Sequence, residues 1–322
     1  MTLSKLAQLA NVSVSVVSKA FSGREDVSES MREHVFAVAR EHGCFQQFYH
    51  VPYDKPVVAV IIPELISQYY IHYMETLKKS LEESGYTMLL SISNFDNRME
   101  EELIRYHIEH GKVDGLIVFG TCPILSNTST AVIFWGHENL GFGCNVGLCL
   151  KDGMEQALLS LKAAGHRRIA YVGEPLTEKK ALLFKELLKQ HGFEVPKEFL
   201  ISSRFRFAQA GADGVRHLWQ REQKPTAIFG AYGYITQGIL SELERMGVSV
   251  PEEVSVISMD SDPYPLHSTR AVACIPSEIE AVCAAMMRAL SERIRSKHPN
   301  RPQIIEVSTR FVNGDTVGYA KN

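Results

Sequence analysis

The chain has 322 residues, of which 45% are hydrophobic and 22% are charged. This length exceeds that of an ordinary single domain, and the composition excludes a disordered or fibrous protein. The formal net charge of −3 gives the chain as a whole no attraction for nucleic acid, but residues 1–24 hold Lys5, Lys19 and Arg24 and no acid. A surface that binds DNA is therefore expected only near the N-terminus.

The cysteines and the N-terminal residues exclude further classes. The six cysteines form no CxxC pair and no Cys/His spacing of a zinc site, so we expect reduced thiols, no metal and no cofactor. The N-terminal residues lack the apolar core of a signal peptide, and no apolar run is long enough to cross a membrane. We therefore expect a cytoplasmic protein.

The N-terminal segment has the pattern of three short helices. Apolar residues at helical spacing predict a helix over 4–10, and Ser13 is a suitable N-cap for a second helix. Asn11 lies between them, where a sharp turn needs a residue that tolerates positive φ. A third helix is expected to start after Ser28 and to end near Gly43. This pattern is typical of a helix-turn-helix, although a bundle used only for packing has the same periodicity.

The segment LSKLAQLANVSVSVVSKAFSGREDVSESMREHVFAVAREHG resembles the headpiece of the lactose-repressor (LacI/GalR) family. The matching pattern is LAxLAxVSVSxVSxAFxG followed by VSExxRExV. The resemblance implies a sequence-specific transcription regulator that reads bases through Val14, Ser15 and Lys19. Lys19 replaces the more usual Arg and can still donate to guanine, without the planar fork of Arg. The expected phosphate contacts, which set register rather than sequence, are Ser13, Ser18, Ser22 and Ser28.

The linker that follows departs from that family. Relatives continue with a hinge helix that inserts a Leu into the minor groove, whereas CFQQFYHVPYDK lacks this Leu and contains Pro52, which interrupts a helix. Gln47 stands at an Asn-like family position and is expected to contact DNA. The aromatic residues Phe48, Tyr49 and Tyr53 could act as wedges between bases. We favour instead a tether whose aromatic side chains pack on the core.

From residue 57 onward, apolar strands alternate with amphipathic helices. Strands are expected at 57–63, 87–93, 114–120, 131–136, 143–150, 167–173, 226–231 and 254–260. Helices are expected at 71–84, 100–111, 152–165, 179–192 and 236–247. This alternation predicts an α/β fold with doubly wound parallel sheets, in which ligands bind beyond the carboxyl ends of the strands.

The motifs VDGLIVFG, AAGHRRIAYVGEP and GVSVPEEVSVISMD extend the resemblance to the rest of the chain. The family has a two-lobed fold like that of type I periplasmic sugar-binding proteins. The implied domains are a helix-turn-helix headpiece at 1–43, an atypical linker at 44–56, and an effector-binding and dimerisation domain at 57–322. The expected N lobe covers about 57–148 and 277–304, and the expected C lobe covers about 149–276 and 305–322.

The resemblance assigns effector contacts to a set of residues that differs from the usual one: Gln68, Tyr69, Tyr70, Lys180, Tyr232 and Asp260. Tyrosine rings can stack on a sugar face, but Lys180 replaces a clamping Arg and loses its bidentate geometry. Asp260 either contacts the ligand or caps its loop. The effector is then a compound unlike a free sugar, or no small effector exists.

The leading interpretation is a homodimeric repressor that binds a pseudo-palindromic operator under the control of a small molecule in the interlobe cleft. An alternative keeps DNA binding but makes the core a dimerisation or protein-docking module without an effector. A third is a solute-binding or enzymatic protein with a vestigial headpiece. Enzyme chemistry is disfavoured because the sequence lacks the GxSxG, Walker A and HExxH motifs, and His166 is expected to be structural.

Overall fold

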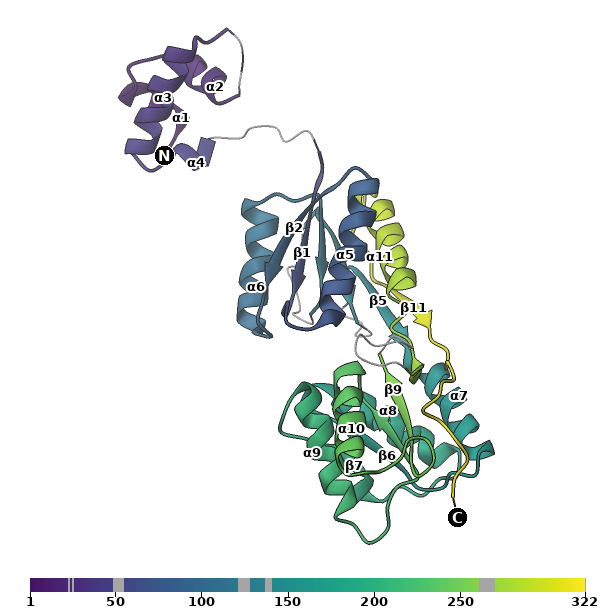
Figure 1. The fold of residues 1–322 in the computed structure, drawn as a ribbon. Coiled ribbons are helices and arrows are strands. Elements are labelled where there is room, and N and C mark those ends of the chain that lie inside the picture. The colour runs from purple at the N-terminus through teal and green to yellow at the C-terminus, as the bar shows by residue number, and fades with distance from the viewer. Residues whose placement is uncertain are drawn as a thin grey trace. The chain divides into compact units, whose positions relative to one another are not determined.

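The computed structural model of the chain describes residues 1–22, 24, 26–48, 55–120, 128–136, 141–260 and 270–321. The chain divides into two compact units, Met1–Pro56 and Val57–Asn322 (Figure 1). Within the described residues, no helix is both long enough and apolar enough to span a membrane.

The first unit is a small helical bundle, called the headpiece below. Its helices are α1 (Leu3–Leu9), α2 (Val14–Phe21), α3 (Glu29–Glu41) and α4 (Phe45–Phe48). Asn11, in the turn between α1 and α2, has a φ of 53°. Ser13 caps α2, because its Oγ accepts a hydrogen bond of 3.2 Å from the backbone N–H of Val16. The predicted sharp turn and the predicted N-cap are both confirmed.

The headpiece extends further along the chain than expected. Cys44 is 5% exposed, and Phe45 and Phe48 pack against the apolar core of the three longer helices. The ring centroid of Phe21 lies 5.8 Å from that of Phe45 and 5.7 Å from that of Phe48. The expected end of the headpiece at Gly43 is therefore wrong, because α4 covers apolar surface that the first three helices share.

This packing also bears on the predicted wedges of the linker. Phe48 is half-buried and packs against the apolar core of the headpiece, of which α4 is a part. The other two candidates, Tyr49 and Tyr53, lie outside the described residues, as does Pro52.

In the second unit, the first parallel sheet and its helices form the N lobe (Figure 1). Among the described residues its strand order is β11-β5-β4-β3-β1-β2. The strands are β1 (Val57–Ile62), β2 (Thr87–Ile92), β3 (Gly115–Val118), β4 (Ala131–Trp135), β5 (Cys144–Cys149) and β11 (Gln303–Ser308). The helices are α5 (Gln68–Glu83), α6 (Asn97–Arg105), its π-helical continuation η1 (Tyr106–His110) and α11 (Ile279–Ile294).

The strand β1 shows why helices cover both faces of this sheet. Val58 and Val60 are completely buried in the cluster that contains α5 and α11. Ala59 and Ile61 are completely buried in the cluster that contains Ile104 of α6. Because successive side chains of a strand point to opposite faces, the unbroken apolar run of β1 requires a helix layer on each side.

The second parallel sheet and its helices form the C lobe. In the described part of the chain its strand order is β10-β9-β8-β6-β7. The strands are β6 (Ile169–Gly173), β7 (Leu200–Ser202), β8 (Ala227–Gly230), β9 (Ser255–Met259) and β10 (Ala273–Ile275). The helices are α7 (Leu150–Ala163), α8 (Glu178–Gln190), α9 (Phe207–Trp219), α10 (Gly233–Arg245) and the 3₁₀ turns η2 (Pro175–Thr177) and η3 (Lys197–Phe199). The predicted α/β class with parallel sheets is confirmed.

The chain passes between the lobes after β5, after β10 and after β11, according to the sheet to which each strand belongs. The expected passage near residue 304 is wrong. All of β11, from Gln303 to Ser308, pairs with β5 in the N lobe. The chain reaches the C lobe only afterwards, where Val312 bridges Cys274. Because the sequence pattern predicts no strand at β11, the expected boundary between the lobes lies too early in the chain.

In the C lobe, α9 and α10 are in close contact. A Cβ atom on Gly238 would lie 1.9 Å from the carbonyl oxygen of Ala208, so the contact requires a glycine at this position. Glu242 of α10 then joins the two helices, although its side chain is only 4% exposed. It accepts hydrogen bonds from Arg216 Nε at 2.8 Å and from Arg245 Nη2 at 2.6 Å.

Glu242→Gln is expected to lower the free energy of unfolding at pH 7 by about 1–3 kcal/mol. Hydrogen bonds from Arg245 and Arg216 hold the pKa of Glu242 at about 2, below its ordinary 4.5. A depressed carboxyl pKa stabilises the folded state above the pKa of the unfolded chain, and this stability is lost as the pH falls from about 4.5 to about 2. Urea unfolding at pH 7 and pH 3 should therefore show a wild-type advantage that shrinks at pH 3.

The matched control is Glu244→Gln, which removes an exposed carboxylate from the same helix. It should leave the free energy of unfolding nearly unchanged at both pH values. A difference between wild type and Glu242→Gln that stays the same at pH 7 and pH 3 would contradict the assigned ion pairs.

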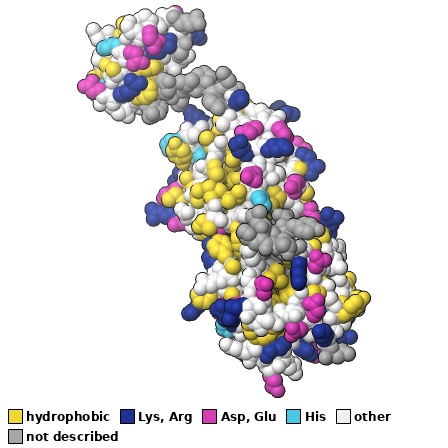
Figure 2. All heavy atoms as spheres, viewed as in Figure 1, with side chains coloured by type: hydrophobic (Ala, Val, Ile, Leu, Met, Phe, Trp, Pro, Cys, Tyr) yellow, Lys and Arg dark blue, Asp and Glu magenta, His cyan; other side chains and the backbone are white. Residues whose placement is uncertain are grey.

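Several exposed apolar side chains, called the β2 patch below, lie along the edge strand β2 and on α6 and η1. Its residues are Leu89 (44% exposed), Leu90 (38%), Ile92 (38%), Met99 (41%) and Tyr106 (58%). Figure 2 shows hydrophobic side chains gathered over this part of the lobe. Among the described strands, β2 lies at the edge of its sheet, so no described strand uses its outer backbone groups.

Candidate functional site

The helix α2 turns its polar side to solvent. Val14 is 43% exposed, and Ser15 and Ser18 are exposed as well. Val17 and Ala20 lie on the opposite side of the helix, where they are buried in the core of the headpiece. Small outward side chains let a helix come close to base edges in a major groove.

The predicted base-reading Lys19 is held by an acid in the free headpiece. Its Nζ lies 2.5 Å from Oδ2 of Asp26, and the two side chains are 42% and 52% exposed. The hydrogen bond from Lys19 lowers the pKa of Asp26, so this carboxylate is charged at neutral pH. Lys19 has to leave this ion pair before it can donate to a base. Exposed ion pairs contribute little, so the exchange is feasible.

Asp26→Asn is therefore expected to raise the affinity for DNA by a few-fold. The substitution releases Lys19 and removes one negative charge beside the binding face. Fluorescence anisotropy titrations at constant salt would measure the change. The control Glu41→Gln removes an exposed acid at the end of α3 and should give a smaller effect. Equal effects of the two variants would show that only the overall charge of the headpiece matters.

The remaining headpiece candidates have partners within the bundle. Ser13 and Ser28 accept hydrogen bonds from backbone N–H groups of their helices, at 3.2 and 3.3 Å, and each hydroxyl can still donate. Ser22 donates to the carbonyl oxygen of Lys19 at 3.3 Å. Gln47 Nε2 donates to the carbonyl oxygen of Met1 at 2.8 Å, so its side chain joins α4 to the N-terminus of the headpiece.

The second candidate site is a pocket of about 920 Å³ lined by residues of both lobes. It contains each of the side chains assigned to the effector from the sequence: Gln68, Tyr69, Tyr70, Lys180, Tyr232 and Asp260. These residues come from the start of α5, from α8 and from the ends of β8 and β9, at the carboxyl edges of the sheets. This is the edge at which parallel sheets bind ligands.

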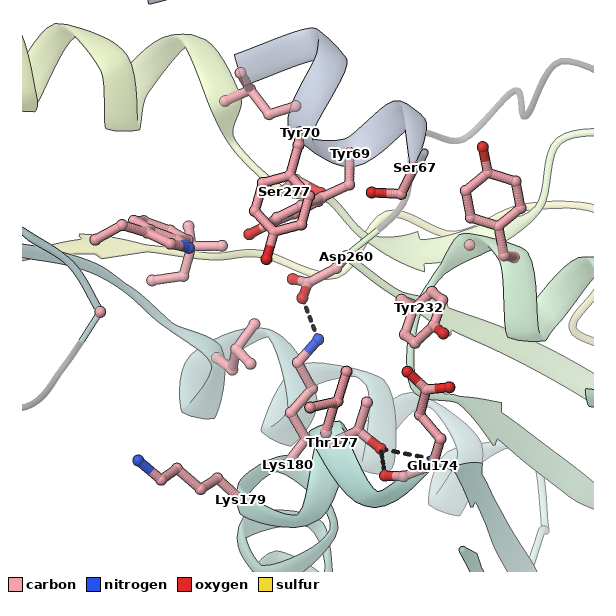
Figure 3. A pocket seen from close by; sticks show the side chains of 18 of the residues that line it. Ser67, Tyr69, Tyr70, Glu174, Thr177, Lys179, Lys180, Tyr232, Asp260 and Ser277 are labelled. Atoms are coloured by element: carbon pink, nitrogen blue, oxygen red, sulfur yellow. Dashed lines mark hydrogen bonds and ion pairs between the residues drawn. The ribbon is translucent and has the colours of Figure 1, made fainter. Parts of the chain in front are cut away.

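Lys180 and Asp260 are partners of one another (Figure 3). Lys180 Nζ forms an ion pair with Asp260 Oδ2 and donates to the carbonyl oxygen of Ala231 at 3.1 Å. The side chain of Asp260 is 9% exposed, and its Oδ1 has no hydrogen-bond partner within the described residues. Lys180 thus occupies one carboxylate oxygen of Asp260, and the other oxygen remains without a partner among the described residues.

Arg206 joins the lobes, although no pattern in the sequence predicted a role for it. Its Nη1 lies 3.6 Å from Glu64 Oε2 in the N lobe, and its Nε lies 3.6 Å from Glu174 Oε1 in the C lobe. Its guanidinium also lies 5.2 Å from the ring centroid of Phe95 and 4.5 Å from that of Phe207. A movement of one lobe relative to the other would change these contacts.

A second contact between the lobes lies nearby. The backbone N–H of Gln68 in the N lobe donates to the hydroxyl oxygen of Tyr234 in the C lobe at 3.2 Å. The ring of Tyr234 in turn packs at 5.6 Å from that of Phe207. The pocket is therefore crossed by polar contacts from both lobes.

Tyr69 and Tyr70 line the N-lobe wall of the pocket, and Tyr73 packs behind Tyr69. The rings of Tyr69 and Tyr70 meet edge to face at 5.1 Å, and Tyr69 contacts Tyr73 at 5.0 Å. Burial raises the pKa of all three phenols above the ordinary value of 10. They are neutral across the physiological range, so each presents a ring face and a hydroxyl group to its surroundings.

The backbone around the pocket is strained. Among the described residues, Phe95 (φ 58°), Phe207 (φ 56°) and Asp260 (φ 42°) line the pocket in the left-handed region. Each such conformation costs on the order of 1–3 kcal/mol in a residue other than glycine, and strain of this kind concentrates at ligand sites. The pocket is therefore maintained at a cost to stability.

His166 lies away from this pocket in a closed hydrogen-bond network. It is 1% exposed, and its ring nitrogens lie 3.0 Å from Thr226 Oγ1 and 3.0 Å from the carbonyl oxygen of Gly318. Burial lowers the pKa of His166. Its contacts join a strand, a loop and the C-terminal segment, which is a structural role.

Sequence comparison places both units in known families. Residues 2–45 match the bacterial regulatory proteins of the lacI family, and residues 159–317 match the periplasmic binding protein-like domain. The chain belongs to the lacI family. This LacI-family chain is 24% identical over 333 residues to the HTH-type transcriptional repressor PurR of Shigella dysenteriae serotype 1 (strain Sd197), covering 98% of the chain and 96% of the relative. The PurR repressor of Escherichia coli O139:H28 (strain E24377A / ETEC) matches with the same identity and coverage.

Solved structures agree with the LacI-family fold. The transcriptional regulator CelR in complex with cellobiose has a TM-score of 0.70 and 23% identity, covering 98% of this chain and 99% of CelR. The lac repressor dimer bound to operator and the anti-inducer ONPF has a TM-score of 0.71 and 16% identity, covering 99% of each chain. At these identities the similarity establishes the fold alone. The family match and the named relatives make this chain a DNA-binding transcriptional regulator and not an enzyme.

Proposed function

We propose that this LacI-family chain is a repressor that binds a pseudo-palindromic operator in the cytoplasm as a homodimer. One observation carries the proposal: the capped helix α2 exposes Val14, Ser15 and Lys19 within a segment that matches the lacI family over residues 2–45. In this proposal α2 of each headpiece enters a major groove, where Lys19 donates to guanine. Hydroxyl groups of the headpiece contact phosphates and set the register; they belong to Ser13, Ser18, Ser22 and Ser28.

The β2 patch supports a dimer. Apolar side chains at the edge of a sheet form a surface suited to association with a second copy. A dimer is also required by the operator, because one recognition helix reads only a few base pairs and two are needed for a selective site. The structural relative lac repressor is described as a dimer bound to operator.

The pocket is proposed to bind a small effector that controls operator affinity. The contacts of Arg206 with Glu64 and Glu174 join the two lobes, so a ligand between them would favour one lobe arrangement. A lobe arrangement that changes the separation of two headpieces changes operator affinity. CelR with cellobiose and lac repressor with ONPF are relatives whose descriptions name a small ligand.

The experiment that tests the proposal is selection of DNA from a random library by the full-length protein. An enriched inverted repeat, bound by two chains in sedimentation, is the expected result. Enrichment of a single asymmetric site by one chain would contradict the dimer, and failure to enrich any sequence would contradict operator binding. If partner proteins but no small molecules altered the affinity for the repeat, the core would be a docking module instead.

A further inference from the structure

The interior of the pocket contains more acids than bases. Glu64, Glu174 and Asp260 line it with side chains that are 8%, 2% and 9% exposed. The cations that pair with these acids are Lys180, whose side chain is 21% exposed, and Arg206, whose side chain is 40% exposed. The three further charged residues of the lining, which lie exposed where solvent screens them, are Lys151, Lys179 and Glu306.

The available cations leave part of this negative charge unmatched. Lys180 is used by Asp260, and Arg206 is shared between Glu64 and Glu174. Both Arg206 contacts are 3.6 Å long, beyond the usual range of about 2.7–3.2 Å for a hydrogen bond from nitrogen to oxygen. Within the described residues, Glu174 Oε2 and Asp260 Oδ1 are buried without a hydrogen-bond partner. Buried carboxylate oxygens of this kind are unfavourable until a donor reaches them.

The ring of Tyr232 lies next to Glu174, and the ring of Phe207 lies next to its partner Arg206. Tyr232 lies beside the Glu174 carboxyl group in Figure 3, and the hydroxyl of Tyr232 accepts a hydrogen bond of 3.3 Å from the backbone N–H of Phe207. The ring of Phe207 already has the Arg206 guanidinium 4.5 Å from its centroid. The faces of such rings attract cations. Glu174 thus lies in an environment that combines a carboxylate with electron-rich rings.

We propose that the effector is a small organic cation, a ring compound that carries a protonated amine, and that the ammonium group binds at Glu174. The inference rests on the proposed use of this pocket as the effector site. The ammonium donates to the unpartnered Oε2 of Glu174 and lies against the rings of Tyr232 and Phe207. The ring of the ligand packs on the tyrosines of the N-lobe wall, and a second donor reaches Asp260 Oδ1.

Two other ligand classes fit the charges less well. An anionic ligand needs an available cation beside the buried acids, and Lys180 and Arg206 both already have acidic partners. A neutral sugar can donate hydroxyl groups to the carboxylates, but it leaves the excess negative charge uncompensated. A protonated amine supplies both a donor and the missing charge.

The test uses matched ligands that differ in one group. Tryptamine, tryptophol and indole-3-propionate place an ammonium, a hydroxyl and a carboxylate on the same ring, and glucosamine and glucose form a second pair. Calorimetric titration and thermal shift of the full-length protein would compare them. In at least one set the ammonium compound should bind about 10–100-fold more tightly than its neutral counterpart, the range for one hydrogen bond to a charged group.

Glu174→Gln should abolish the preference for the ammonium compound. The control Glu186→Gln removes an exposed carboxylate from α8 and should keep the preference. If Glu174→Gln fails to fold, Tyr232→Leu removes a neighbouring ring and should weaken the ammonium compound more than the neutral one. Equal binding of ammonium and neutral compounds, tighter binding of the acid, absence of binding by both ammonium compounds, or an unchanged preference in Glu174→Gln would overturn the inference.

Operator binding by the same proteins separates this inference from the proposed function. If the wild-type protein selects an inverted repeat but shows no preference for the ammonium compound, the cationic effector is disproved and the proposed repressor function still stands. If the wild-type protein prefers the ammonium compound but selects no DNA sequence, the proposed repressor function is disproved and the binding of a cation in the pocket still stands.

Discussion

Lys19→Ala is expected to remove most of the sequence preference of DNA binding while leaving the headpiece folded. Lys19 projects from α2 and meets only the exposed Asp26 within the described headpiece, so alanine leaves no buried group without a partner. A specific contact between a side chain and a base edge is worth about 1–3 kcal/mol per half-site. Two half-sites give about 2–6 kcal/mol for a dimer, which corresponds to a loss of affinity of roughly 30-fold to 10⁴-fold.

Anisotropy titrations with the selected operator and with a scrambled duplex, at one salt concentration, would measure this loss. The variant should retain its weak affinity for the scrambled duplex, reduced only by the lost charge. Lys189→Ala removes an equal charge from the end of α8 in the other unit and should leave both affinities unchanged. A parallel decrease for operator and scrambled DNA would show that Lys19 contacts phosphate and reads no base.

Leu90→Lys, in the β2 patch, is expected to convert the protein to a monomer and to weaken operator binding strongly. Leu90 is 38% exposed at the edge of the N-lobe sheet, so a lysine is tolerated in the monomer but places a charge in an apolar interface. Linked binding sites exceed the affinity of one site by about 10²–10⁴-fold, and separate headpieces lose this gain. Light scattering after size-exclusion chromatography and operator titration would follow the two effects together.

Leu182→Lys is the matched control, because Leu182 is 59% exposed on α8 of the C lobe. This variant should remain dimeric and bind the operator normally. A Leu90→Lys protein that stays dimeric would place the interface elsewhere. A monomeric variant that binds the operator as tightly as wild type would show that tight operator binding does not require two headpieces.

The headpiece could be predicted closely from the sequence, because its signals are local. A cap at Ser13, a residue with positive φ at Asn11 and an apolar stripe on each helix decide its structure within a few residues. The error concerned α4, whose two phenylalanines are placed by contacts with Phe21, a residue distant in the sequence. A linker sequence alone does not show which surface its aromatic side chains will cover.

In the core, several of the missed elements have weak local signals. The helix α9 contains Gly211 and Gly214, which disfavour a helix but permit its close packing. The strand β11 lies at a sheet edge with mostly exposed side chains, so it lacks the continuous apolar run of β1. The strands β7 and β10 are three residues long, too short for a periodic pattern to be recognised.

The pocket could be predicted only in part. The family resemblance named six lining residues, but it missed the charges that join the lobes, namely Glu64, Glu174 and Arg206. Two of these had a signal, because Glu64 and Glu174 closely follow strands of parallel sheets, where ligands bind. The position of Arg206 between them depends on how the lobes meet, whereas Lys180 and Asp260 pair within the C lobe. Such pairings are tertiary contacts that periodicity does not encode.

The measurement that tests the central claim most directly is a chemical footprint of wild-type protein and Lys19→Ala on the selected operator. The account predicts two symmetric regions of protected guanine N7 atoms, one in each half-site and separated by about one helical turn or a multiple of it. The Lys19→Ala protein should lose the protection in both regions at once. A single protected region, or an unchanged pattern with Lys19→Ala, would contradict a dimer that reads its operator through α2.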